Sequence, residues 1–334
     1  MHSAVTISIA LVHGLLSGVQ ARGRPVEPFL ADAGIAPELL AQPGSRVTAD
    51  QYAALFRSLI ERLDDESLGF MSRPLKRGSF ALLARSALTA GTLEVALRRI
   101  AHTLGLLQDD VMLEQVREGG LAGVSLRLIH PSVAAPIFFQ EMLVRVIWRL
   151  AAWLVGGRLR IERFDFAFEC PPHAASYGKI FPAPLRFGQP RSTFWFTVQR
   201  LQEPVRRDEE SLRAFLLDSQ AQIIVPRRDE SRVSERLRRY LQHTQPAWPD
   251  LGAAAEALHM SSSTLQRRLA SEGTSFQALR DQLRRDIAIV RLNTSKVPLA
   301  VLAEELGFAD SANFQRAFKA WTGSAPGAYR RGGE

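Results

Sequence analysis

Two Gln-Arg pairs near the C-terminal end have the residue types that reading DNA bases requires. The sequence contains Gln266-Arg267 and, further on, Gln315-Arg316. An arginine can donate two hydrogen bonds to guanine in the major groove, and a glutamine can bond to adenine in the same groove. The two pairs therefore predict contacts with double-stranded DNA, provided that helices hold both pairs outward.

Helical spacing places both pairs on an exposed face. Leu265 and Leu269 are four residues apart, as are Phe314 and Phe318, so each couple marks the buried face of a helix. The residues expected to face outward and contact DNA are Ser263, Gln266 and Arg267 in the first helix, and Ala312, Gln315 and Arg316 in the second. Two ordinary solvated helices are the alternative, but the same phase in both copies favours a shared role. The Ala312 side chain cannot hydrogen-bond a base, so we expect fewer contacts from the second helix.

The segments that carry these residues are two copies of one unit. Residues 251–269 read LGAAAEALHMSSSTLQRRL, and residues 299–318 read LAVLAEELGFADSANFQRAF. Each copy predicts a helix-turn-helix motif, at about 250–271 and 298–321. The predicted N-caps are Asp250, Asp310 and either Ser261 or Ser262, and the predicted left-handed ends of the first helices are Gly307 and His259.

A long amphipathic helix is predicted between the two copies, over residues 276–292. At 1.5 Å per residue it is about 25 Å long. Two recognition helices held by such a helix would lie about one turn of DNA apart, roughly 34 Å. Both would then enter successive major grooves on one side of the duplex.

Residues 232–331 resemble the DNA-binding domain of the AraC/XylS family of bacterial transcriptional regulators. The resemblance is carried by SSSTLQRRL from Ser261, RRDIAIVRL from Arg284, and the segment from Val297 to Arg330. The family's base-contacting positions fall on the same six residues that the helical phase selects. The resemblance implies a transcription factor that also contacts RNA polymerase; an activator and a repressor are both compatible with the sequence.

The N-terminal part predicts an α+β domain that is mostly helical with a small sheet, followed by the all-α domain of two helix-turn-helix units. Apolar residues recur at helical spacing at 52–63 and at 93–100, where Thr92 is a plausible N-cap, and an apolar run at 4–19 predicts a core helix. Strands are predicted at 111–113, 122–128, 160–169, 185–187 and 193–198.

The N-terminal part also resembles the mostly helical effector-binding and dimerisation domain of one branch of the same family. Leu75–Ile100 and Tyr177–Phe187 carry this resemblance. We therefore expect an effector-binding and dimerisation domain at 1–226 and the DNA-binding domain at 232–334, with a linker near 226–231. The resemblance implies a small-molecule effector and a homodimer.

Composition agrees with a cytoplasmic DNA-binding protein. The formal net charge is +8, and the residues from 227 onward hold 17 Lys and Arg against 12 Asp and Glu. A basic C-terminal third favours contact with phosphates. The single cysteine, Cys170, excludes an intramolecular disulfide, and we expect it to be buried at the end of a strand. The apolar runs at 4–19 and 142–155 are not typical of a signal peptide or a membrane span.

An enzyme is the main competing class. The sequence contains no nucleophile elbow, phosphate-binding loop or metal-binding histidine pattern, so neither a cofactor nor a metal is expected. DNA-repair proteins with a similar domain need several cysteines, which are absent. The acidic pairs are expected to be solvated rather than catalytic; they are Asp64-Asp65, Asp109-Asp110 and Glu209-Glu210. We therefore expect no enzymatic activity.

A second alternative is a DNA-binding regulator that has no small-molecule effector and is controlled by a protein partner. Phe138, Phe139, Trp148 and Trp153 have the residue types that line a ligand pocket, but core packing accounts for them equally well. The sequence therefore identifies no effector-binding residue.

Overall fold

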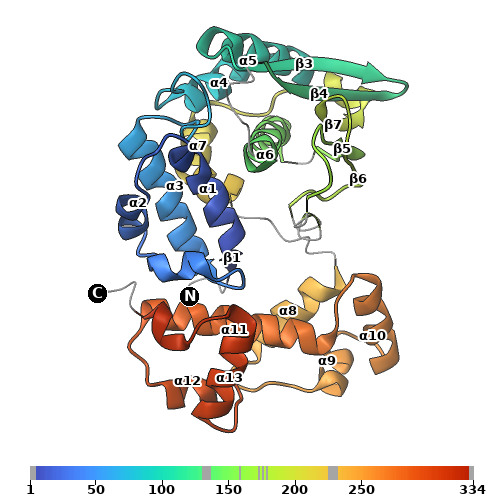
Figure 1. Ribbon diagram of the computed structural model, residues 1–334. Helices are drawn as coiled ribbons and strands as arrows, with labels where there is room; N and C mark the ends of the chain where they lie inside the picture. Colours follow the sequence, from blue (N-terminus) through green and yellow to red (C-terminus); the bar gives the residue numbers. More distant parts are fainter. Residues whose placement is uncertain are drawn as a thin grey trace. The chain divides into compact units, whose positions relative to one another are not determined.

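The computed structural model describes residues 5–129, 137–157, 159–171, 174, 177, 180–224 and 232–330. The linker predicted near 226–231 lies outside the described residues. The chain forms two compact units, each of which combines separate stretches of sequence (Figure 1). The first consists of Met1–His13, Glu27–Ala54 and Arg228–Glu334, and the second of Gly14–Val26 and Leu55–Arg227.

The second unit packs helices against a five-stranded sheet. Its helices are α4 (Ser79–Leu88), α5 (Leu93–Leu107), α6 (Ile137–Leu154) and α7 (Glu209–Ile224), with a 3₁₀ turn at Val198–Gln202. Its strands are β3 (Val111–Glu118), β4 (Leu121–Leu128), β5 (Arg163–Asp165), β6 (Leu185–Arg186) and β7 (Ser192–Thr197). The strand order is β3-β4-β7-β5-β6, and every pairing is antiparallel except β5 with β6. Helix α5 packs against β3, and α6 packs against β7.

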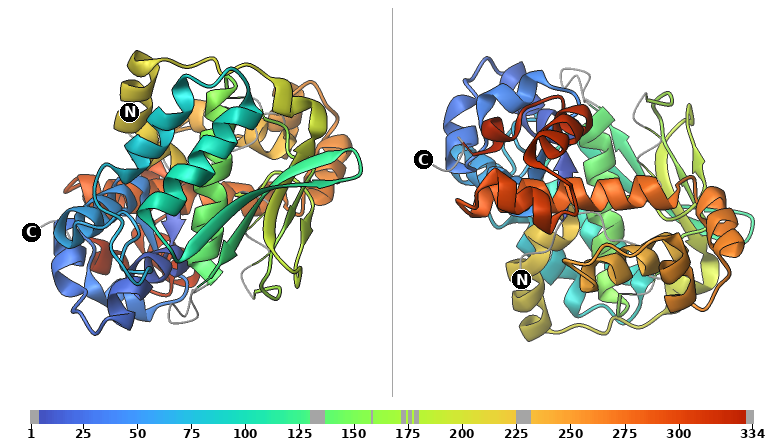
Figure 2. Two further views of the ribbon diagram at one scale, coloured as in Figure 1. Left: turned by 90° about the horizontal axis from the view of Figure 1, so that it is seen from above. Right: turned by 90° about the horizontal axis from the view of Figure 1, so that it is seen from below.

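Several predicted elements of the N-terminal part are confirmed. The helix predicted at 52–63 is α3 (Ala49–Leu63), and α5 begins after Thr92, whose side chain accepts a hydrogen bond from the Val95 amide. The predicted strand pair is the β3–β4 hairpin, which is longer than predicted and stands out in the left view of Figure 2. The turn at Gly119 requires a positive φ of 57°, which glycine adopts without strain.

The strand predicted at 160–169 is wrong in length, because only β5 remains of it. The alternating Phe164, Phe166 and Phe168 are all buried, with ring centroids 6.4 Å apart for the first two and 4.9 Å for the last two. The intervening Asp165 is buried as well, because it accepts a hydrogen bond from Trp195 Nε1 at 2.7 Å. The alternation of phenylalanines with polar or small residues therefore does not mean that all the residues between them face solvent.

Two further predictions about polar residues are wrong. Asp65 and Asp110 are each 2% exposed rather than solvated, although their neighbours Asp64 and Asp109 are exposed. Asp65 accepts hydrogen bonds from the amides of Ser67, Gly69 and Leu75, and Asp110 accepts from Ser72. Both carboxylates thus hold loops by binding backbone amides. Cys170 is exposed and does not end a strand.

The N-terminal stretch of the first unit begins with a strand rather than the predicted continuous helix. Strand β1 (Thr6–Ser8) pairs antiparallel with β2 (Arg46–Thr48), and helix α1 (Ile9–Ala21) starts only after β1. Between α1 and β2 lie α2 (Glu27–Asp32) and a 3₁₀ turn at Pro37–Ala41. Both strands pack against α11 (Phe276–Thr294) of the same unit.

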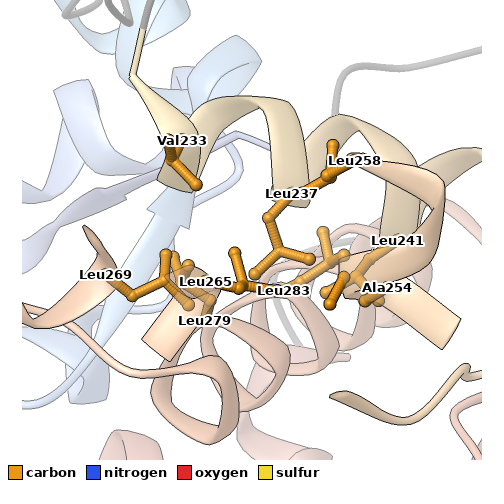
Figure 3. Packing of buried hydrophobic residues seen from close by; sticks show 10 residues of the cluster. Val233, Leu237, Leu241, Ala254, Leu258, Leu265, Leu269, Leu279 and Leu283 are labelled. Carbon is orange, nitrogen blue, oxygen red and sulfur yellow. The ribbon is translucent and has the colours of Figure 1, made fainter. Parts of the chain in front are cut away.

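The C-terminal stretch of the first unit is all helical, as predicted. Its elements are α8 (Val233–His243), α9 (Leu251–Ala257), α10 (Ser262–Ser271), α11, α12 (Leu299–Glu305), α13 (Ser311–Thr322) and a 3₁₀ turn at Pro326–Tyr329. Leucines from α8, α10 and α11 converge in one core cluster, in which Leu237, Leu265, Leu269 and Leu283 are fully buried (Figure 3). This cluster fixes α10 against its neighbours.

Candidate DNA-binding surface

The first helix-turn-helix motif consists of α9 and α10. The Asp250 side chain accepts a hydrogen bond from the Ala253 amide at 2.9 Å, and Ser261 accepts from the Thr264 amide at 3.2 Å, so these two residues are the N-caps. The turn after α9 contains a left-handed residue, His259, with a φ of 56°. A left-handed backbone is strained for a residue other than glycine, and the second copy has a glycine at the corresponding position.

The second motif, α12 and α13, repeats this arrangement with a more favourable turn. Gly307 has a φ of 71°, where the first copy has His259. Pro298 lies at the N-cap of α12, and the Asp310 side chain caps α13 by accepting from the Asn313 amide at 2.6 Å. The helix-turn-helix interpretation of both copies is thus confirmed in its helices, caps and turns.

The recognition helices α10 and α13 have their apolar residues buried and their predicted base-reading residues exposed. Leu265, Leu269, Phe314 and Phe318 are each 0% exposed. The six candidate residues are all exposed: Ser263, Gln266 and Arg267 on α10, and Ala312, Gln315 and Arg316 on α13. Each helix therefore presents one Gln-Arg pair to solvent on the side away from the core.

The two copies differ in how their polar side chains are held. In the second copy, Arg316 Nη2 donates to Asn313 Oδ1 at 2.5 Å, and Asn313 Nδ2 donates to Asp310 Oδ2 at 2.7 Å. Gln315 Nε2 donates to Ser311 Oγ at 3.2 Å. In the first copy, the side chains of Gln266 and Arg267 have no hydrogen-bonding partner among the described residues. The arginine of the second copy is thus hydrogen-bonded to a side chain of its own helix.

Sequence reasoning missed Asn313 as a residue that positions Arg316. The signal was available, because Asn313 is three residues after the N-cap Asp310 and three before Arg316, and residues three apart are neighbours on a helix. The first copy has Thr264 at the corresponding position.

Helix α11 connects the two motifs. Its 19 residues correspond to a length of about 28 Å. Figure 1 and the right view of Figure 2 show it running from the end that carries α10 to the end that carries α12 and α13. This length is close to the roughly 34 Å that separates successive major grooves on one side of the duplex.

The described residues provide neither a metal-binding cluster nor a membrane-spanning helix. They contain no group of His, Cys, Asp and Glu side chains that would hold a metal ion. None of the helices in the described part of the chain combines the length and apolarity that crossing a membrane needs.

Comparison with known proteins gives matches over both parts of the chain. A family model described as the arabinose-binding domain of AraC transcription regulator, N-term, matches residues 23–205, and one described as a helix-turn-helix domain matches residues 254–332. The chain is 29% identical to the ornithine utilization regulator of Pseudomonas aeruginosa over 98% of this chain and 97% of the relative.

More distant relatives are also regulators. An uncharacterized HTH-type transcriptional regulator of Mycobacterium tuberculosis is 27% identical over 93% of this chain and 92% of its own length. The crystal structure of the transcriptional regulator CdpR from Pseudomonas aeruginosa aligns over 98% of this chain and 99% of that chain, with 19% identity. The TM-score of this alignment is 0.32.

Proposed function

Because the chain belongs to the family of AraC transcription regulators, we propose that it controls transcription by reading DNA with the Gln-Arg pairs of α10 and α13. The protein is a DNA-binding transcriptional regulator with an N-terminal domain of the arabinose-binding type. One observation supports the reading mode above all: the two recognition helices expose the same pair of residue types at the same helical phase. We propose that the protein has no enzymatic activity.

Each recognition helix enters a major groove in this proposal. Arg267 and Arg316 bond to guanines, Gln266 and Gln315 bond to adenines or neighbouring groups, and Ser263 adds a further polar contact. Ala312 contributes only apolar contact, such as to a thymine methyl group. The surrounding Lys and Arg side chains bind phosphates without reading sequence.

Selection from a random-sequence DNA library with the full-length protein tests this function. We expect enrichment of two short conserved blocks, centred about one helical turn or 10–10.5 base pairs apart. Affinity for the selected duplex should fall by roughly 10³-fold between 50 and 200 mM salt, because phosphate contacts release counterions. A selection that yields no sequence above the starting library would contradict the proposal.

We also propose that the protein works as a homodimer under small-molecule control, in the cytoplasm and in contact with RNA polymerase. The domain at 1–226 would bind the effector and pair two chains, and the domain at 232–334 would bind DNA. Pairing raises the effective concentration of the second DNA-binding domain. An effector changes transcription only if it binds one arrangement of the protein better than another.

Sedimentation of the full-length protein tests the pairing. We expect a mass of two chains at micromolar concentration, and a footprint on promoter DNA about twice as long as the two grooves that one chain covers. A single-chain mass at tens of micromolar, together with a footprint of about two grooves, would leave control by a protein partner as the better explanation.

A further inference from the structure

One arginine of α11, the linker helix between the two motifs, contacts the segment just before the first motif and the turn of the second. Arg284 lies near the middle of α11 and is 9% exposed. Its guanidinium carbon is 4.9 Å from the ring centroid of Trp248 and 5.0 Å from that of Phe308. Trp248 lies two residues before Asp250, the N-cap of α9, and Phe308 lies two residues before Asp310, the N-cap of α13.

Hydrogen bonds join the same three elements. Trp248 Nε1 donates to the backbone oxygen of Glu305, the last residue of α12, at 3.0 Å. Arg284 Nη2 donates to the backbone oxygen of Gly307 at 3.3 Å. A Cβ atom at Gly307 would lie 2.7 Å from Trp248 Cδ1 and 2.9 Å from Arg284 Nη2, so only glycine fits at this turn.

Arg284 has a buried guanidinium that forms no ion pair with any described residue, because no carboxylate in that part of the chain lies within ion-pair distance of it. Burial and then the neighbouring Arg280 lower the pKa of this group, and only the Asp281 carboxylate, beyond ion-pair distance, raises it. Burying a charge without a direct ion-pair partner is costly, and two aromatic faces and one carbonyl offset only part of that cost. A leucine or methionine would fill the same space without this cost, so simple packing does not explain an arginine here.

We infer that Trp248, Arg284 and Phe308 form a clamp that sets the spacing between the two DNA half-sites that one chain reads. The guanidinium can contact both rings and donate to the Gly307 carbonyl in only one arrangement of the two motifs. An apolar side chain has no such directional contacts and would be compatible with several arrangements. Arg284 is thus a positioning residue that touches no base. An insertion of one base pair moves the second half-site by about 3.4 Å and rotates it by about 35°, which the clamped motifs do not follow.

The test compares the half-site spacing selected by the full-length protein and by the Arg284→Met variant from one random DNA library. We expect the parent to select two blocks at a single spacing, and Arg284→Met to select the same blocks at several spacings. In direct binding, one inserted base pair should weaken the parent about tenfold and the variant about twofold. Arg284→Lys keeps a cation near the rings and should restore part of the spacing preference.

Arg236→Met is the matched control, because it removes the same charge from an exposed position of α8. It should leave the selected spacing unchanged. If circular dichroism shows that Arg284→Met does not fold, Trp248→Phe replaces it, since this change removes only the bond to Glu305 and part of the ring. An unchanged single spacing in the folded variant overturns the clamp.

The inference rests on the proposed reading of DNA by α10 and α13, but different experimental results would contradict the proposed function and the clamp. No enriched sequence with the parent protein contradicts the proposed function. Two blocks at one spacing with both the parent and the folded clamp variant contradict only the clamp.

Discussion

Replacing Arg267 with alanine should weaken binding of the full-length protein to its selected DNA by roughly 5- to 150-fold, or about 1–3 kcal/mol. The exposed guanidinium has no hydrogen-bonding partner within the described residues, so the variant leaves no buried group unsatisfied and should fold normally. The loss should fall on one base position, at which the variant selects all four bases more evenly. Binding to unrelated DNA should change only by the loss of one charge.

Arg268→Ala provides the matched control for this measurement. Arg268 follows Arg267 on α10 and is exposed as well, but it lies outside the face predicted to enter the groove. Its removal should weaken binding to selected and to unrelated DNA by similar factors. It should also reduce the slope of log affinity against log salt concentration by about one. If instead Arg267→Ala binds its selected DNA as tightly as the parent does, the predicted orientation of α10 in the groove is wrong.

The helix-turn-helix motifs were predictable from the sequence because the forces that form them are local. The caps Asp250, Ser261 and Asp310 bond to amides three residues away, and the left-handed turn at Gly307 depends on the backbone of one residue. The four-residue spacing of Leu265 and Leu269 determines which face is buried. The same phase argument placed all six candidate residues on the exposed face.

Features that depend on distant parts of the chain were not predictable in this way. Asp65 and Asp110 are in hydrophilic stretches, yet loops that return to them bury both carboxylates. The short β1 was missed although residues 5–9, VTISI, alternate as in a strand, because the apolar run continues to residue 19 and its pairing partner β2 lies about 40 residues further on. The sequence likewise gave no sign that β1 and β2 belong to the same compact unit as the helix-turn-helix motifs.

A buried carboxylate on α11 explains why these two strands pack there. Asp286 is 3% exposed and accepts a hydrogen bond from Thr6 Oγ1 of β1 at 2.6 Å. Three guanidinium groups surround it, those of Arg285 at 3.1 Å, Arg238 of α8 at 3.6 Å and Arg46 of β2 at 3.8 Å. One signal was present in the sequence, because Asp286 is three residues after Leu283 and therefore shares the apolar face of α11.

Asp286→Ala should lower the free energy of unfolding of the full-length protein by about 3 kcal/mol, because it removes the carboxylate that the buried Arg238 and the partly buried Arg46 and Arg285 share. The expected loss lies at the lower end for a broken buried ion pair, since the side chains of Arg46 and Arg285 are 23% and 19% exposed. The pKa of Arg46 is lowered to about 10, mainly by burial and then by the nearby Arg285, whereas Asp286 acts to raise it. Without Asp286 the cost of keeping Arg46 charged rises, which favours release of β2 from α11.

Urea unfolding followed by circular dichroism measures this loss, and a second variant assigns it. Thr6→Val keeps the shape of the side chain but removes the hydroxyl that donates to Asp286 and accepts from Arg46 Nε, and should cost about 1–2 kcal/mol. Because the two side chains touch, the double variant should lose less than the sum of the single losses. Additive losses, or a change below about 0.5 kcal/mol for Asp286→Ala, would mean that β1 does not depend on the linker helix. A coupled loss would instead show that β1 and α11, the helix that connects the two recognition motifs, stabilise each other through the bond between Thr6 and Asp286.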